Sequence, residues 1–148
     1  MIADIVEKIK LHQKRSKAAL DEIVSWKTIN SEIFNNFEKI KTIDTFIYRF
    51  IKLQDMMGEK LFKIFLDEIG EYKDNMSLLD ILDKLEKFEI IKNAYDWMEY
   101  RKLRNQLTHE YPNNEDEIIE GIILAIDVYK EIDTIFNNII RYHDERLK

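Results

Sequence analysis

The chain has no cysteine, one proline and three glycines among its 148 residues. The absence of cysteine excludes disulfide bonds and metal sites built on thiolates. Because proline and glycine interrupt helices and favour turns, their scarcity favours long helices over a sheet with many tight turns. No run of about 18 apolar residues occurs, so no segment is predicted to span a membrane. The N-terminal stretch MIADIVEKIK is amphipathic and contains acidic residues, unlike a signal or transit peptide. We therefore expect a cytoplasmic protein without a membrane partner.

The chain also has no excess of basic residues. It has 23 Lys and Arg residues and 29 Asp and Glu residues, which gives a net charge of −6. Proteins that hold nucleic acid tightly through its phosphates are usually basic. Any contact with RNA would then depend on a local basic patch or on a weak, transient encounter. The best such patch is the stretch YRKLR, in which Arg101 and Lys102 are candidates for RNA binding.

The residues that are present favour amphipathic helices, since 45% are hydrophobic and 35% are charged. Apolar residues recur at steps of three and four along most of the chain. No internal repeat, low-complexity tract or linker marks a second domain. We therefore predict a single all-α domain over residues 1–148, a bundle of four to five helices. The apolar faces of such long helices also favour pairing with a second copy as a symmetric homodimer.

Local signals place the expected helices. The first is expected over about 3–26 and the second over about 44–71, with a less regular connection between them and Gly58 inside the second. Ser77 is a good N-cap for a short helix that ends near Lys87. A fourth helix is expected over 93–110, and Asn113 or Asn114 should cap the last one. The last helix has a heptad seam formed by Ile118, Ile122, Ala125, Tyr129, Ile132, Phe136, Ile139 and His143.

The end of the fourth helix, RNQLTHEY, is the best candidate for a functional site. On an ideal helix, Tyr111 lies about 20°, Thr108 about 40° and Arg101 about 60° from Arg104, so these four side chains share one face. Arginine can grip a phosphate and stabilise charge that develops on it. The tyrosine hydroxyl can hydrogen-bond or accept a transferred group. The helix is therefore predicted to bury one side and to offer Arg101, Arg104, Asn105, Thr108 and Tyr111 on the other.

His109 lies about 140° from Arg104 on the same projection, so the two do not form a compact pair on a straight helix. Asn105 and His109, four residues apart, are expected to face each other. Either the helix end distorts before Pro112, or Arg104 and His109 meet across two subunits. We favour the second, because a symmetric contact brings two copies of one patch together.

These residues fit one reaction class. Histidine moves protons near neutral pH, and arginine stabilises a phosphate as its charge changes. The sequence offers no convincing metal cluster and no signature of a cofactor, so we expect neither. The fitting reaction is metal-free cleavage of RNA, in which a ribose 2′-hydroxyl attacks the adjacent phosphate.

The stretch from Arg104 to Tyr111 resembles the Arg-x-x-x-x-His-x-Tyr signature of HEPN-domain toxins, in particular the HepT proteins. The layout of the chain is similar to theirs over most of its length, but the residue match is specific only across 104–111. The resemblance implies an HEPN-like fold and a homodimeric, metal-independent endoribonuclease whose two motifs line a cleft at the interface. Arg104 and His109 would be catalytic, with Asn105 and Thr108 in support.

The resemblance also implies a toxin that cleaves cellular RNA, such as tRNA or mRNA. Its antitoxin would be a minimal nucleotidyltransferase of the MntA type, which silences the toxin by transferring AMP to the motif tyrosine, here Tyr111. An adenylate adds bulk and negative charge where an RNA phosphate would bind, which gives the silencing a physical basis.

Other interpretations remain open. Arg104 and His109 could instead satisfy the carbonyls at a helix C-terminus. The whole chain could be a non-catalytic helical partner of a nucleotidyltransferase, or a generic scaffold. Elsewhere, His12 and His143 fall on apolar stripes and are expected to be partly buried and hydrogen-bonded. For Gln54 and Asp55, a solvated helix face is favoured over a role in orienting His109.

Overall fold

The structure is a computed structural model that describes residues 2–109 and 114–146. The described residues form helices and no strand, which confirms the all-α prediction. The helices are α1 (Ile2–Ser25), α2 (Phe37–Met56), α3 (Phe62–Glu68), α4 (Leu78–Lys87), α5 (Ala94–Thr108) and α6 (Glu115–Arg146). A 3₁₀ helix, η1 (Ser31–Asn35), precedes α2, and a π-helical turn, η2 (Met57–Leu61), joins α2 to α3. Because α2, η2 and α3 are continuous, they count as one long helix, and the described chain is a five-helix bundle.

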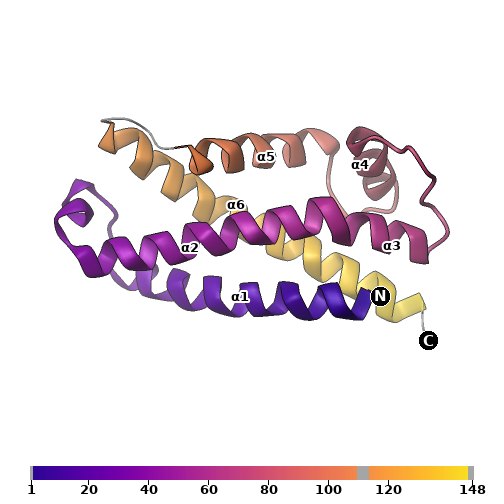
Figure 1. Cartoon of the computed structure of the whole chain (residues 1–148), viewed down its shortest axis with the longest axis horizontal. Helices are drawn as coiled ribbons and strands as arrows, with labels where there is room; N and C mark the ends of the chain where they lie inside the picture. Colours follow the sequence, from indigo (N-terminus) through magenta and orange to yellow (C-terminus); the bar gives the residue numbers. More distant parts are fainter. Residues whose placement is uncertain (1, 110–113, 147–148) are drawn as a thin grey trace.

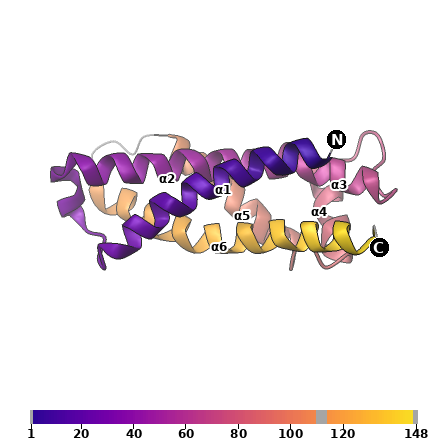
Figure 2. The ribbon, with the colours of Figure 1, turned by 90° about the horizontal axis from the view of Figure 1, so that it is seen from below.

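Helix α2 is the central element of the bundle. Helix α1 runs antiparallel along one side of it and α5 along the other, while α6 crosses the bundle diagonally (Figure 1). Seen at right angles to this view, α1 runs obliquely between α2 and α6, and its start lies at the same end as the end of α6 (Figure 2). Helix α4 contacts α3 and α5 at that end. This arrangement brings side chains of α2 against α5, the helix that carries the motif.

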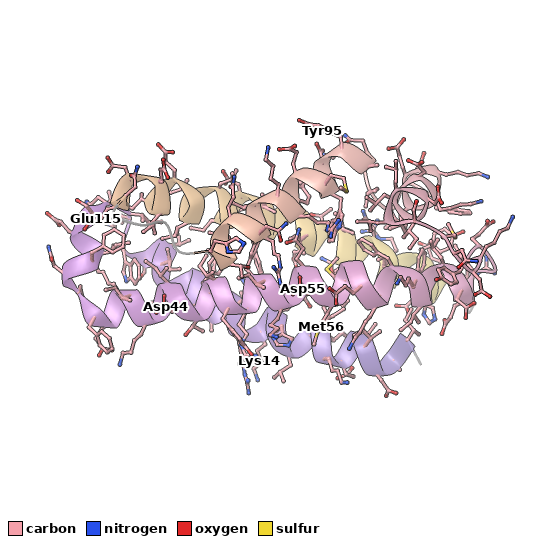
Figure 3. All side chains as sticks on the ribbon, turned by 45° about the horizontal axis from the view of Figure 1, so that its top comes forward. Lys14, Asp44, Asp55, Met56, Tyr95 and Glu115 are labelled. Carbon is pink, nitrogen blue, oxygen red and sulfur yellow. The ribbon has the colours of Figure 1, made fainter. Side chains whose placement is uncertain are left out.

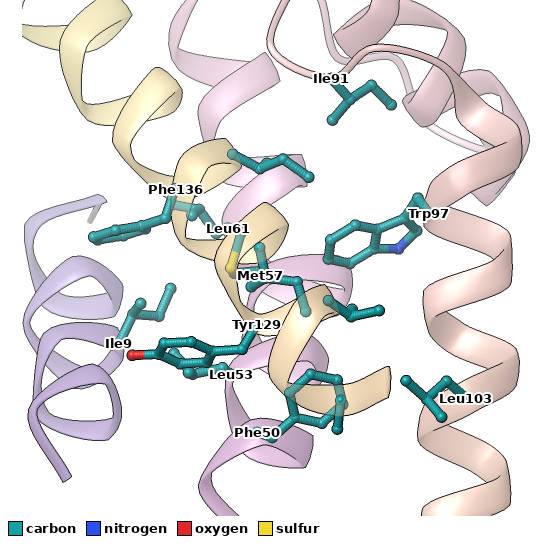
Figure 4. Close-up of a cluster of buried hydrophobic side chains, with 14 of the residues drawn as sticks. Ile9, Phe50, Leu53, Met57, Leu61, Ile91, Trp97, Leu103, Tyr129 and Phe136 are labelled. Carbon is teal, nitrogen blue, oxygen red and sulfur yellow. The ribbon is translucent and has the colours of Figure 1, made fainter. Parts of the chain in front are cut away.

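The core lies where α1, α2 and α6 meet. Steps of three and four along α2 and η2 bury Phe46, Phe50, Leu53 and Met57, all at most 2% exposed. Ile9 of α1 packs against this surface from one side and residues of α6 from another (Figure 4). The seam predicted for α6 is largely confirmed. Its buried members are Ile122, Ala125, Tyr129, Ile132, Phe136 and Ile139, while Ile118 and His143 are half-buried.

Two predicted helix starts are confirmed in detail. Ser77 and Asp80 form a capping box, in which each side chain accepts a hydrogen bond of 3.1 Å from the backbone N–H of the other. Before α6, Asn114 Oδ1 accepts from the N–H of Glu117 at 3.0 Å. Both caps satisfy backbone donors that a helix start would otherwise leave unpaired.

The predicted start of the second helix is wrong, because α2 begins at Phe37 and not near residue 44. Asn36 caps it by accepting from the N–H of Lys39 at 3.2 Å. Phe37 is 69% exposed, and Ile43 is the first residue of α2 that is buried. The first turns therefore carry no regular apolar stripe, which is why periodicity places the start too late.

Gly58, predicted to lie inside the second helix, lies in the π turn η2. A Cβ atom placed on it would lie 3.4 Å from Cζ2 of Trp97. The Trp97 ring from α5 therefore lies close to this turn, at a distance where an added methyl group would make an ordinary contact. Of the helices in the described ranges, none is both long and apolar enough to cross a membrane.

Candidate functional site

Helix α5 positions most of the predicted site residues. Asn93 caps its start by accepting a hydrogen bond of 2.8 Å from the N–H of Asp96. The helix ends at Thr108, two residues before the predicted end. The next residue, His109, has extended backbone angles (φ −91°, ψ 134°), and its N–H donates to the carbonyl of Asn105 at 3.4 Å. The chain therefore leaves the helical direction at His109.

Arg104 is held by an aspartate of α2. Its Nε and Nη2 atoms donate to the two carboxylate oxygens of Asp55 at 2.9 and 2.8 Å, a two-pronged ion pair. Figure 3 shows Asp55 on the side of α2 that faces α5. The hydrogen bonds that Arg104 donates to Asp55 raise the pKa of Arg104. The two side chains are 27% and 28% exposed, so a ligand in solution can reach the pair.

The third guanidinium nitrogen of Arg104, Nη1, donates to side chains of its own helix. Its Nη1 donates to Thr108 Oγ1 at 3.1 Å and to Asn105 Oδ1 at 3.4 Å. The Thr108 hydroxyl donates in turn to the carbonyl of Arg104 at 2.9 Å. The hydrogen bonds of the guanidinium thus go to side chains of Asp55, Asn105 and Thr108. This network differs from the helix-cap interpretation, in which the arginine would satisfy terminal backbone carbonyls.

Arg104 and Asp55 line a pocket of about 350 Å³ between the continuous helix α2–η2–α3, α4 and α5, which we call the polar pocket. Met76, Leu78 and Ile81 form its apolar wall. Gln54 and Gly58 form part of its wall on the α2 side, and Trp97 and Arg101 on the α5 side. It also contains the charged side chains of Glu59 and Lys63. The pocket therefore combines cations, carboxylates and amide groups around Arg104.

His109 is exposed and lines a different hollow. This second hollow, the apolar groove, has a volume of about 630 Å³ and lies between α2, the end of α5 and the start of α6. Its apolar lining consists of Ile43, Ile47, Ile51, Leu107, Ile118 and Ile122. Asp44, Tyr48, Thr108 and His109 complete it. Within one chain, Arg104 and His109 therefore line separate hollows, with Thr108 between them.

The other predicted site residues divide between these surfaces. Asn105 lines the polar pocket with Arg104, so the expectation that it faces His109 is wrong. The reason is that the helix ends before His109. Arg101 also lines the polar pocket, while Lys102 is exposed and belongs to neither lining. Tyr111, the predicted modification site, lies outside the described residues.

Gln54 and Asp55 are the site residues that sequence reasoning underrated. The prediction of a solvated helix face is wrong, because Gln54 is only 2% exposed and Asp55 binds Arg104. The available signal was a pair of adjacent polar residues in the middle of an otherwise apolar stripe. Pattern alone could not show that α5 packs against that point of α2.

His12 and His143 are partly buried and hydrogen-bonded, as predicted. His12 Nδ1 lies 3.0 Å from Nη1 of Arg49, and His143 Nε2 lies 2.8 Å from a carboxylate oxygen of Glu68. Burial lowers the pKa of His12, and the nearby charges of Arg49 and Lys52 lower it further. A neutral His12 accepts the hydrogen bond from Arg49. Among the described residues, no group of three or more His, Asp or Glu side chains is placed to hold a metal ion.

Comparisons of the chain with protein-family models, with curated proteins and with solved structures find no match. The geometry of the site is therefore the basis for assigning a function.

Proposed function

We propose that the protein is a metal-independent endoribonuclease of the HEPN type, a HepT-like toxin that acts on cellular RNA as a homodimer. The observation that carries this proposal is the end of α5. There Arg104 stands in a polar pocket that a ligand can reach, and His109 is exposed five residues later. An arginine can stabilise charge on the phosphate and a histidine can transfer protons, and metal-free cleavage of RNA can proceed with these two groups.

In the proposed reaction, the 2′-oxygen of a ribose forms a bond to the adjacent phosphorus, and the bond from phosphorus to the 5′-oxygen breaks. The products are a 2′,3′-cyclic phosphate and a 5′-hydroxyl. His109 takes the proton from the 2′-hydroxyl or supplies one to the leaving 5′-oxygen, and solvent water serves the other oxygen. Arg104 stabilises the negative charge on the phosphate oxygens, and a phosphate replaces Asp55 as its partner. Asn105 and Thr108 hold the guanidinium in position.

The proposal requires two copies of the chain. Arg104 and His109 line separate hollows in one chain, so the arginine of one protomer would serve the histidine of the other. We propose that the second copy packs over the apolar groove, whose lining of isoleucine and leucine includes His109 at its polar side. A two-fold contact of this kind brings both motifs to one cleft.

Regulation forms part of the same proposal. A minimal nucleotidyltransferase of the MntA type would silence the enzyme by transferring AMP to Tyr111. The added phosphate would lie two residues from His109 and repel the RNA backbone there. In the unmodified enzyme, Arg101 and Lys102 would guide the RNA substrate, a tRNA or an mRNA, to the cleft.

The second candidate is a non-catalytic helical partner of a nucleotidyltransferase. The Arg104–Asp55 ion pair favours it, because an arginine already held by a carboxylate has a structural role without any RNA. The net charge of −6 also favours it.

Expression without any neighbouring gene separates the two candidates. We expect the parent to arrest growth and degrade RNA, and His109→Ala to do neither. The matched control is His143→Ala, which removes a histidine that pairs with Glu68 away from the site and should remain toxic. Equal growth of the parent and His109→Ala would favour the non-catalytic partner.

A further inference from the structure

The polar pocket contains two polar side chains that are buried without hydrogen-bond partners. Gln54 is 2% exposed and Trp97 is 1% exposed. Neither amide atom of Gln54, Nε2 or Oε1, has a partner among the described residues, and nor does Nε1 of Trp97. Buried polar groups are rarely left unpaired, because losing water without a replacement bond is costly. These three atoms are therefore the strongest indication of a ligand in the described part of the chain.

The backbone beside these atoms is also unusual. The π turn η2 starts three residues after Gln54, and Gly58 within it lies close to the Trp97 ring. The ring centre of Phe62, one turn after Gly58 in the same continuous helix, lies 4.7 Å from that of Trp97. Turns of this type occur often at functional sites. The indole of Trp97 is thus held against this helix by contacts with Gly58 and Phe62.

The charges of the pocket suit a phosphate at its outer part. Lys63 and Arg101 are exposed and line the pocket together with Arg104. Asp55 and Glu59 are the acidic residues of the lining, and Asp55 is paired with Arg104. Cations therefore exceed carboxylates by one in the lining, although the whole chain is acidic.

The amide of Gln54 limits the kinds of ligand group that could bind in the inner part of the polar pocket. A carboxamide presents one acceptor beside one donor, which complements the adjacent donor and acceptor on the edge of a nucleobase. The Trp97 N–H is a further donor, which a ring nitrogen or carbonyl of the same base can accept. A volume of about 350 Å³ is near the lower limit for ligand pockets and suits one base.

We infer that the polar pocket binds a single nucleobase, read by Gln54 and Trp97, with the attached phosphate at Arg101 and Lys63. This inference rests on the proposed function for its substrate, since the base would belong to the RNA whose scissile phosphate meets Arg104. The inference goes beyond the proposed function because it explains how the enzyme selects the position at which it cleaves the RNA. The polar atoms of Gln54 and Trp97 are covered by the lining, so the base enters when Arg104 leaves Asp55 for the phosphate.

The test uses the two tryptophans of the chain as reporters. The indole N–H resonances of Trp97 and Trp26 are followed by ¹⁵N NMR during titration with AMP, GMP, CMP and UMP. Trp26 is half-buried near Lys39, away from the pocket, and serves as the internal reference. We expect at least one nucleotide to shift the Trp97 resonance, while ribose 5-phosphate, which has no base, shifts neither.

A substitution at Gln54 gives a second, independent readout. Gln54→Met keeps the size of the side chain and removes its polar atoms. It should weaken binding of the responding nucleotide about tenfold or more and raise the thermal midpoint, because two unpaired buried atoms disappear. The matched control is Gln13→Met, at a site where the amide donates to Asp133. That variant should bind normally and unfold at a lower temperature.

Two results would overturn the inference. One is a Trp97 resonance that no nucleotide moves in the folded protein. The other is a Gln54→Met variant with a lowered midpoint, which would mean that the amide is satisfied within the fold. Mononucleotide binding needs neither His109 nor cleavage, so it is measured equally well in His109→Ala. Binding without any ribonuclease activity would contradict the proposed function and leave the base site standing.

Discussion

The ion pair between Arg104 and Asp55 permits a quantitative prediction for Asp55→Asn. The substitution keeps the shape of the side chain and removes the charge that holds the guanidinium at 2.8 and 2.9 Å. Hydrogen bonds to charged groups contribute roughly 1.5–3 kcal/mol. Because more than a quarter of each side chain is exposed, the freed guanidinium regains part of its hydration. We expect a loss of about 1–2 kcal/mol in the free energy of unfolding, or a fall of roughly 2–8 °C in Tm.

The same substitution should strengthen RNA binding. Removing a unit charge next to Arg104 removes a competitor for the phosphate worth about 1 kcal/mol in water, or roughly a fivefold gain in affinity. Binding is measured by fluorescence anisotropy in a His109→Ala background, which prevents cleavage. Urea unfolding of the same proteins gives the stability.

Glu71→Gln is the matched control for both measurements. Glu71 accepts one hydrogen bond from Lys84 at 3.1 Å, which lowers the pKa of the glutamate, and its side chain is similarly exposed. It should cost less stability than Asp55→Asn and leave RNA binding unchanged. Unchanged stability in Asp55→Asn would refute the reasoning about the ion pair. Unchanged RNA affinity with a clear loss of stability would show that Arg104 does not meet the RNA.

Three further predictions test other parts of the account. Gly58→Ala should raise the free energy of unfolding by about 0.5–1 kcal/mol, because alanine favours a helix and its Cβ meets Trp97 at an ordinary contact distance. Gly58→Leu should lower the free energy of unfolding, because its larger side chain displaces the indole. The lowered pKa of His12 means that the unfolded chain takes up a proton first as the pH falls below about 6.5, so stability should decline there. Urea unfolding at pH 7.5 and 5.5 should show a smaller decline in His12→Asn, whose amide oxygen can still accept from Arg49; an equal decline would mean that His12 is not the group responsible. Co-expression with the proposed MntA-type nucleotidyltransferase should add adenylate mass to the parent and none to Tyr111→Phe, and equal masses for the two would contradict modification of this tyrosine.

Periodicity and caps account for most of what the sequence predicts about the fold. The stripe of Ile5, Ile9 and Ile23 places α1, and the Ser77–Asp80 box places the start of α4. Both signals are local, so one sequence is enough to detect them. Periodicity does not predict the start of α2, because Phe37 is exposed and no apolar stripe begins until Ile43.

The site is harder to predict because its contacts are distant in sequence. Arg104 is apparent from the motif, but its partner Asp55 is 49 residues away, and only the packing of α5 on α2 brings them together. The burial of Gln54 has the same cause. Arg104 and His109 line two different hollows because the helix ends at Thr108. A projection on an ideal helix assumes that the helix continues through His109, so it cannot predict this separation.

The central claim is that one protomer supplies Arg104 and the other His109, and subunit mixing tests it most directly. Arg104→Ala and His109→Ala are purified separately, mixed at equal amounts, unfolded and refolded together, and assayed on RNA in the presence of EDTA. In a mixed dimer, one of the two composite sites keeps both residues. Half of the dimers are mixed, so we predict that the mixture regains about a quarter of the parental cleavage rate, while each variant alone stays inactive. A mixture as inactive as its two components, with mixed dimers verified by mass, would contradict the claim.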